Sequence, residues 1–183
     1  MKKRALIVLA EGFEESEAVI PMDILKRCEV EVISAGLRSE TVLGAHGIAV
    51  KTDMIFEKYN GTPDAIILPG GMPGAENLAS SVKLKDLIVE MNLAKKVVAA
   101  ICASPVVVLE PAGILKRKNA TCYPGMEKGF SPDVRFLKDD VVVDGNIITS
   151  RGPYTAFAFG FKVAEVLSGK AKADMVASQM LRK

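Results

Sequence analysis

Residues 96–105 read KVVAAICASP, a run of β-branched and small apolar residues that ends in a cysteine, two small residues and a proline. The apolar part has the length and composition of a parallel strand that is buried on both faces. A strand that turns abruptly into a helix at small residues has the form of a nucleophile elbow, which projects one side chain from the carboxyl end of the strand. Cys102 occupies that corner.

The rest of the chain repeats this pattern of strand and helix. Short β-branched runs occur at 4–9, 30–35 and 64–69, and segments of helical period lie at 15–28 and 83–95. This alternation is typical of βαβ units on a parallel sheet. We therefore predict an α/β fold, a three-layer sandwich with a mostly parallel sheet and helices on both faces.

The first predicted helix has a narrow apolar stripe. Ala18, Val19, Met22 and Leu25 recur at spacings of three and four, so we expect them to face the core. Ser16, or the acidic turn before it, is the expected cap.

The remaining segments predict smaller elements. Residues 43–51 carry two glycines around a histidine and resemble a ribbon more than a helix, and Asp144-Gly145-Asn146 is a hairpin signal. Two closing helices are expected at about 154–168 and 172–181. The apolar face of the first comprises Phe157, Phe161, Ala164 and Leu167.

Length and composition predict one globular domain over residues 1–183, with 49% hydrophobic and 25% charged residues. The net charge is +2 and the basic residues are scattered, which argues against a nucleic-acid partner.

The apolar run at 5–10 is too short for a signal peptide and meets an acidic cluster, so we expect a first strand there. No apolar stretch approaches the roughly 20 residues that span a bilayer, so we expect no membrane association and a cytoplasmic location.

Three cysteines, Cys28, Cys102 and Cys122, show neither CxxC nor histidine-paired spacing. We therefore expect no disulfide framework and no metal site. Cys102 alone would be interpreted as a buried structural thiol. Its place at a helix start favours a reactive thiolate of lowered pKa instead, while Cys28 and Cys122 lack such a context.

Three loops should meet at the carboxyl edge of the sheet, those at 10–17, 68–78 and 101–105. Gly70-Gly71 is either a tight turn or a close approach of backbone N–H groups to an oxyanion. The glutamates of the first loop are either a solvated helix start or the source of a general acid or base for Cys102. These glutamates are Glu11, Glu14, Glu15 and Glu17.

Four motifs together resemble the ThiJ/PfpI superfamily, in particular its branch of the parkinsonism-associated protein deglycase and its bacterial relatives. They are KRALIVLAEGFEESEAVIPMDILKR at 3–27, LPGGMPGAENL at 68–78, AAICASP at 99–105 and TSRGPYTAFAFG at 149–160. The resemblance runs almost end to end. It implies a flavodoxin-like fold, a homodimer and cofactor-free chemistry.

The resemblance also implies roles for individual residues. Cys102 is the nucleophile and Glu17 the buried glutamate that hydrogen-bonds it. The oxyanion pocket and its rim are assigned to Gly70, Gly71, Ala103, Arg151 and Pro153. The dimer interface is expected along the first helix, with Met22, Lys26 and Arg27.

Three positions distinguish this chain within the family. Ala103 stands where peptidase relatives carry a histidine after the nucleophile, which disfavours a cysteine peptidase. Tyr123 stands where the deglycase has a histidine before a proline, so an imidazole base is absent from that part of the pocket. His46 aligns with a family arginine. It is interpreted either as a satisfied or exposed loop histidine or as a cation or proton shuttle that reaches Cys102 of the opposite subunit.

The predicted function is that of a glyoxalase or deglycase acting on α-oxoaldehydes or their adducts, with Cys102 as nucleophile and no cofactor, protective against carbonyl and oxidative stress. The alternative is a redox sensor or stress chaperone in which Cys102 is oxidised to sulfenic or sulfinic acid without turnover.

Overall fold

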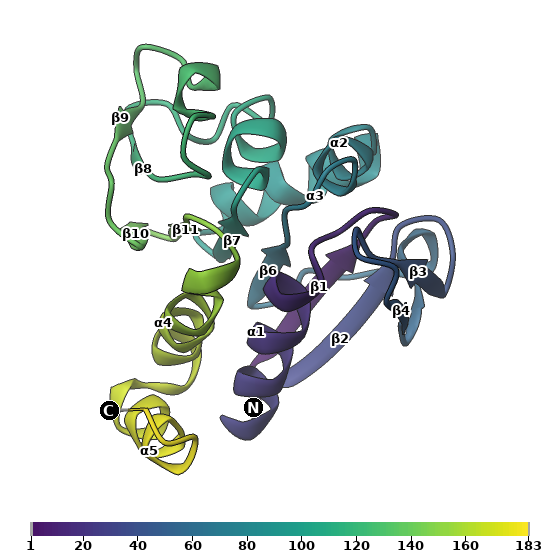
Figure 1. Cartoon of the computed structure of the whole chain (residues 1–183), viewed down its shortest axis with the longest axis vertical. Helices are drawn as coiled ribbons and strands as arrows, with labels where there is room; N and C mark the ends of the chain where they lie inside the picture. The colour runs from purple at the N-terminus through teal and green to yellow at the C-terminus, as the bar shows by residue number, and fades with distance from the viewer. Residues whose placement is uncertain (1, 183) are drawn as a thin grey trace.

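The computed structural model describes residues 2–182 and is built around a seven-stranded sheet (Figure 1). The strand order is β10-β11-β7-β6-β1-β2-β5, and every neighbouring pair is parallel except β10 with β11. The strands are β1 Arg4–Leu9, β2 Glu31–Gly36, β5 Met54–Ile55, β6 Ala65–Leu68, β7 Val97–Ile101, β10 Val141–Asp144 and β11 Ile147–Ser150. The mostly parallel sheet predicted from the β-branched runs is confirmed.

The order of the strands decides which face each helix covers. The chain steps one way along the sheet from β1 to β2 and the opposite way from β6 to β7. Because such crossovers are right-handed, the helices that follow β1 and β6 lie on opposite faces. Figure 1 shows α1 beside α4 on one side of the sheet and α2 with α3 on the other. The carboxyl ends of β1 and β6 therefore mark the topological switch point, where open α/β sheets bind ligands.

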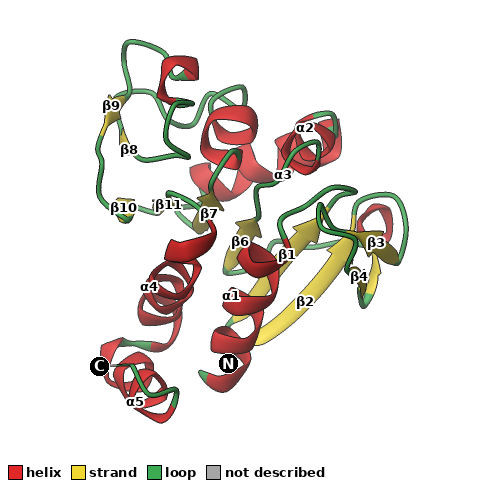
Figure 2. Cartoon of the chain, viewed as in Figure 1, coloured by secondary structure: helices red, strands yellow, loops and turns green. Residues whose placement is uncertain are grey.

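The helices fall close to their predicted positions. They are α1 Glu15–Arg27, α2 Gly74–Ala79, α3 Val82–Leu93, α4 Ala156–Ser168 and α5 Lys170–Gln179, with a short π-helical segment, η2, at Pro105–Leu109 (Figure 2). Only α2 was not predicted, because its six residues lie inside the glycine-rich loop. Within residues 2–182 no helix is both long and apolar enough to cross a membrane.

The buried face of α1 differs from the predicted stripe. Ala18 and Leu25 are buried as expected, but Val19 is 45% exposed and Met22 only half-buried. The helix packs closely on α4, where a β-carbon on Gly160 would lie 2.8 Å from Cδ1 of Ile24. This close approach fixes the rotation of α1 and turns Val19 toward solvent. Of the two expected caps, the acidic turn before Ser16 is the one found, because Glu14 is the N-cap and Ser16 lies within the first turn.

The remaining predictions are largely confirmed. The stretch around His46 is an antiparallel ribbon of β3 Thr41–Leu43 and β4 Ala49–Lys51, and the hairpin at Asp144-Gly145-Asn146 joins β10 to β11. In α4 three of the four predicted apolar residues are buried, whereas Phe157 is 50% exposed. The pair β8 Asn119–Ala120 and β9 Arg135–Phe136 was not predicted, because two-residue strands leave no periodic pattern.

Candidate active site

Loops from three strands meet at the switch point. Glu14, at the start of α1, donates its backbone N–H to the carbonyl oxygen of Gly70, which follows β6, at 3.0 Å. Ser104, after β7, donates its hydroxyl to the carbonyl oxygen of Pro69. Hydrogen bonds therefore tie the loops after β1, β6 and β7 together, as the sequence predicts for the carboxyl edge of the sheet.

Cys102 has the backbone of a nucleophile elbow. Its φ angle is +65°, a left-handed conformation that is uncommon for a residue with a side chain. Its N–H donates to the carbonyl oxygen of Ser150 at 3.0 Å, and its own carbonyl oxygen accepts from the N–H of Tyr123 at 2.8 Å. The elbow is therefore held from both sides, which is how a strained backbone persists.

The glycines of the second loop let the chain approach this elbow. A β-carbon on Gly70 would lie 2.6 Å from Cβ of Cys102 and 2.9 Å from Oε2 of Glu17, closer than real carbon contacts allow. Gly71 has a φ angle of +84°, and a β-carbon there would lie 2.4 Å from the backbone nitrogen of Glu14. Both positions therefore require glycine, because neither has room for a side chain.

Glu17 is fully buried beside Cys102. Its Oε2 accepts a hydrogen bond from the N–H of Gly70 at 2.8 Å, while its Oε1 has no hydrogen-bond partner among residues 2–182. Burial raises the pKa of Glu17 to about 7, with the charge of Glu14 adding to the rise and the N–H of Gly70 opposing it. This carboxyl group therefore titrates close to neutral pH.

The pKa of Cys102 is raised rather than lowered, so the expectation of a thiolate stabilised by a helix start is wrong. Burial and the charge of the neighbouring Glu17 raise the pKa of the thiol to about 12. The N–H groups of Gly71 and Ala103 act in the opposite direction. The turn after Cys102 leads into the five-residue η2 segment, and this short element does not outweigh burial.

Glu17 and Cys102 therefore behave as one coupled pair. Two acids this close in a buried site do not both ionise near neutral pH, because the second charge would be repelled by the first. The pair holds a single negative charge once its first proton is lost near the pKa of Glu17, about 7. A proton shared between a carboxyl group and a sulfur is a suitable arrangement for general acid and base chemistry.

The predicted oxyanion donors divide into two groups. The N–H of Gly70 is committed to Glu17, whereas the N–H groups of Gly71 and Ala103 interact with the sulfur of Cys102. The structure thus brings together five of the predicted site residues, and two of the three predicted amides, those of Gly71 and Ala103, lower the pKa of the Cys102 thiol against the effect of burial.

The predicted rim residues take different positions. Arg151 donates through a guanidinium nitrogen to the carbonyl oxygen of Lys138, and its buried Nε has no partner in the described part of the chain. Pro153 is exposed at the start of a short 3₁₀ helix, η4, at Pro153–Thr155. Tyr123 is 48% exposed, and its ring packs over Gly152, which sequence reasoning did not single out.

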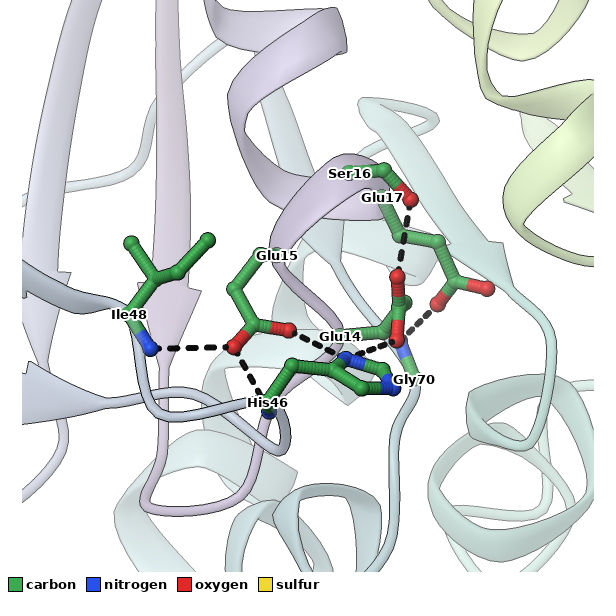
Figure 3. Close-up of polar contacts among 7 residues, drawn as sticks. All are labelled: Glu14, Glu15, Ser16, Glu17, His46, Ile48 and Gly70. Carbon is green, nitrogen blue, oxygen red and sulfur yellow. Dashed lines mark hydrogen bonds and ion pairs between the residues drawn. The ribbon is translucent and has the colours of Figure 1, made fainter.

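His46 pairs with the start of α1 in its own chain (Figure 3). Its Nδ1 lies 2.9 Å from Oε2 of Glu15 and 3.3 Å from Oε2 of Glu14, and its backbone N–H donates to Oε1 of Glu15 at 2.7 Å. The hydrogen bond to Glu15 and the charge of Glu14 raise the pKa of His46. This pairing supports the interpretation of His46 as a satisfied loop histidine, and its role toward a partner subunit stays a prediction.

The acidic cluster is only partly solvated. Glu15 is 7% exposed and Glu17 is fully buried, so the interpretation of these two as a solvated helix start is wrong. Within residues 2–182 the ligand atoms of Glu14, Glu15 and His46 form a group within 4.8 Å of one another that could hold a metal ion. The ion pairs of His46 already account for this proximity.

A separate cavity of about 1010 Å³ runs along α4 and α5. Pro153, Tyr154 and Phe157 line one end of it, but Cys102 and Glu17 do not contribute to it. Cys102 and Glu17 therefore lie outside this cavity.

The fold and the site define an α/β protein of the flavodoxin-like class with a cysteine on a nucleophile elbow. The chain belongs to the DJ-1/PfpI family, because the sequence pattern of that family matches residues 3–166. The family resemblance predicted from the four motifs is confirmed.

Three relatives show how far the similarity extends. The chain is 38% identical over 184 residues to protein dj-1beta of Drosophila melanogaster, covering 99% of this chain and 98% of that protein. It is 36% identical over 175 residues to the glutathione-independent glyoxalase DJR-1.2 of Caenorhabditis elegans, with coverages of 94% and 93%. It is 40% identical over 169 residues to protein DJ-1 homolog B of Arabidopsis thaliana, where the match covers 91% of this chain but 38% of that protein.

Solved structures confirm the fold class. The crystal structure of Drosophila melanogaster DJ-1beta superposes with a TM-score of 0.96 at 37% identity, covering 100% of both chains. Toxoplasma gondii DJ-1 in an oxidized form superposes with a TM-score of 0.94 at 39% identity, covering 98% of both chains.

Proposed function

We propose that this chain is a cysteine-dependent, cofactor-free glyoxalase that converts α-oxoaldehydes such as methylglyoxal into 2-hydroxy acids, and that it acts as a deglycase on the adducts of these aldehydes. The observation that supports this most strongly is the buried pair of Cys102 and Glu17, which meet beside Gly70 and where the N–H groups of Gly71 and Ala103 lower the pKa of the thiol. The name of the C. elegans relative as a glutathione-independent glyoxalase supports the same activity.

The first step uses the single charge of the pair. Cys102, as the thiolate, adds to the aldehyde carbon C1 of methylglyoxal, so that an S–C bond forms and the carbonyl electron pair moves onto oxygen. The N–H groups of Gly71 and Ala103 stabilise the oxyanion, and protonated Glu17 supplies the proton that completes the hemithioacetal.

The second step moves hydrogen within the adduct. The carboxylate of Glu17 removes the proton from C1, and the C1–H electron pair forms the C1–C2 double bond of an enediol as the C2 oxygen takes up a proton. A proton then returns at C2 while the C1 hydroxyl loses its own, which leaves a thioester at C1. C1 is oxidised and C2 is reduced by the same electron pair, so the products balance without an outside oxidant. Water then attacks the resulting thioester of Cys102, the C–S bond breaks, and lactate leaves with the thiol restored.

The quaternary structure belongs to the same proposal. We infer a homodimer formed through α1 and the start of α4, because the apolar side chains of Val19 and Phe157 are exposed there. Sedimentation of wild type beside Phe157→Asp tests this interface: the wild type is expected as a dimer and the variant as a monomer. A monomeric wild type contradicts the proposal.

The proposal also covers the number of domains and the cellular location. We propose one domain over residues 1–183 and a cytoplasmic location. Limited proteolysis that leaves one resistant core, and fractionation of cells that produce the chain, test the two statements.

The test of the activity is loss of methylglyoxal in the absence of glutathione, with lactate quantified as product. Turnover is expected in the wild type and in Cys28→Ser, a matched control thiol outside the site, and is expected to be lost in Cys102→Ser and Glu17→Gln. A wild type that makes no lactate, or a Cys102→Ser variant that still does, contradicts the proposal.

A second candidate function is a peroxide sensor. The T. gondii relative of the same fold was solved in an oxidized form, which supports this alternative. Here the Cys102 thiolate attacks one oxygen of hydrogen peroxide, the O–O bond breaks to give sulfenic acid and hydroxide, and protonated Glu17 gives its proton to the hydroxide to form water. Mass spectrometry after stoichiometric peroxide is expected to find one added oxygen on Cys102 and none on Cys28 or Cys122.

A further inference from the structure

Tyr123 lies next to Gly152 and to the proposed reactive pair of Cys102 and Glu17. A β-carbon on Gly152 would lie 3.3 Å from Cδ2 and 3.6 Å from Cε2 of the Tyr123 ring, so the ring edge rests on the bare glycine backbone. The hydrogen bond from the N–H of Tyr123 to the carbonyl oxygen of Cys102 ties this residue to the elbow itself. The ring is therefore held in place relative to Cys102 while 48% of the residue remains exposed.

The unpartnered oxygen of Glu17 faces the same place. The point that a β-carbon on Gly152 would occupy is 4.0 Å from Oε1 of Glu17 as well as 3.3 Å from the Tyr123 ring. This Oε1 is buried and has no hydrogen-bond partner among residues 2–182. Buried polar atoms are nearly always satisfied, so an oxygen of this kind is available to a bound hydroxyl group.

We propose that Tyr123 is a specificity-determining residue that selects α-oxoaldehydes carrying a flat aromatic substituent, the phenylglyoxal class, over methylglyoxal. The inference rests on the proposed glyoxalase activity. The hydroxyl of the hemithioacetal at C1 bonds to Oε1 of Glu17, and the aryl group on C2 packs against the exposed face of the Tyr123 ring. An aromatic pair gains more than area burial alone, whereas the methyl group of methylglyoxal contacts only a small part of the ring.

The experiment compares kcat/KM for phenylglyoxal and for methylglyoxal in four proteins. Wild type and Tyr123→Phe, which keeps the ring, are expected to share one ratio that favours phenylglyoxal. Tyr123→Leu is expected to lower that ratio about three- to tenfold, the size of one aromatic pair, mainly through phenylglyoxal. Tyr154→Leu, the same change at a tyrosine that is 97% exposed, is the matched control and is expected to keep the wild-type ratio.

Two further outcomes separate a failure of this inference from a failure of the proposed function. A ratio in Tyr123→Leu equal to the wild-type ratio overturns the inference while leaving the glyoxalase activity intact. If the wild type turns over neither aldehyde, the proposed function fails, and the same four proteins are compared by calorimetric binding of phenylglyoxylate and pyruvate, which lack the aldehyde. A preference for phenylglyoxylate that only Tyr123→Leu loses then supports the aromatic wall, and equal preferences in all four proteins overturn it.

Discussion

The α-carbon of Gly70 faces the side chain of Cys102 so closely that a β-carbon on the glycine would lie 2.6 Å from the Cβ of the cysteine. Only a hydrogen atom fits between the two residues. The same β-carbon would also meet Oε2 of Glu17 at 2.9 Å. Gly70 is thus the point at which Cys102, Glu17 and the loop after β6 come into contact.

Gly70→Ala is predicted to disturb both stability and activity. The added methyl group must displace the elbow or the carboxyl group, which is expected to lower the free energy of unfolding by about 1–3 kcal/mol and kcat/KM by about 100-fold. Gly113→Ala is the control, because this glycine also has a positive φ angle but a β-carbon there meets nothing within 4 Å. It is expected to lose about 1 kcal/mol from backbone strain alone and to keep its kcat/KM. Denaturant unfolding and steady-state kinetics measure both, and equal kinetics in the two variants would contradict the close-contact argument.

Glu17→Gln is predicted to change the pH profile as well as the rate. In the wild type kcat/KM is expected to rise with pH through about 7, the pKa to which burial raises Glu17, because below this pH the pair carries no charge. Without the carboxyl group the buried thiol of Cys102 is the remaining acid, so the midpoint moves upward. The rate at pH 7 falls about 10²- to 10⁴-fold, the range for loss of a general acid or base.

Glu57→Gln, an exposed glutamate outside the site, is the control for that profile and is expected to match the wild type at every pH. The rate of Cys102 alkylation by iodoacetamide, followed by mass spectrometry, reports the same midpoint independently of turnover. A midpoint in Glu17→Gln that stays at the wild-type value rules out the coupled pair.

The elbow strain at Cys102 predicts an unusual order of stabilities. Because the φ angle is +65°, a residue with a side chain is strained there by about 1–2 kcal/mol relative to glycine. Cys102→Gly is therefore expected to unfold at a higher denaturant concentration than Cys102→Ala, although glycine usually destabilises a chain. Urea unfolding of the two variants decides the point. If the alanine variant is the more stable, the backbone at Cys102 is not strained.

His46 is predicted to make stability depend on pH. Its pKa is raised in the folded chain by the hydrogen bond to Glu15 and the charge of Glu14, so the folded protein keeps the proton to higher pH than the unfolded chain does. The stabilisation is complete below the unfolded pKa of about 6.5, while the glutamates remain ionised, and is lost as the pH rises through the raised value.

His46→Gln should therefore melt below the wild type at pH 5.5 and at the same temperature at pH 9. Because His46 is the sole histidine of the sequence, its imidazole resonances report the pKa directly by NMR. Equal melting temperatures at pH 5.5, with an imidazole pKa at or below 6.5, would show that the ion pairs do not form.

Local sequence patterns predicted most of the fold. The β-branched runs, the helical periods at 15–28 and 83–95 and the turn at Asp144-Gly145-Asn146 correspond to elements of the structure, because period and turn chemistry are properties of short segments. Val19 and Phe157 were wrongly assigned to the core, since the rotation of each helix depends on its partner. Gly160 sets that rotation by letting α1 approach α4, a contact between segments far apart in the chain.

The candidate site was likewise predicted only in part from the sequence. The local motifs predicted that Cys102 follows one strand, that glycines follow another and that glutamates follow a third. They did not predict that Glu17 is buried with a pKa of about 7, that the thiol of Cys102 has a raised pKa, or that His46 pairs with Glu14 and Glu15. Burial and charge repulsion depend on which distant segments surround a group, and those neighbours are set by the packing of the strands and helices.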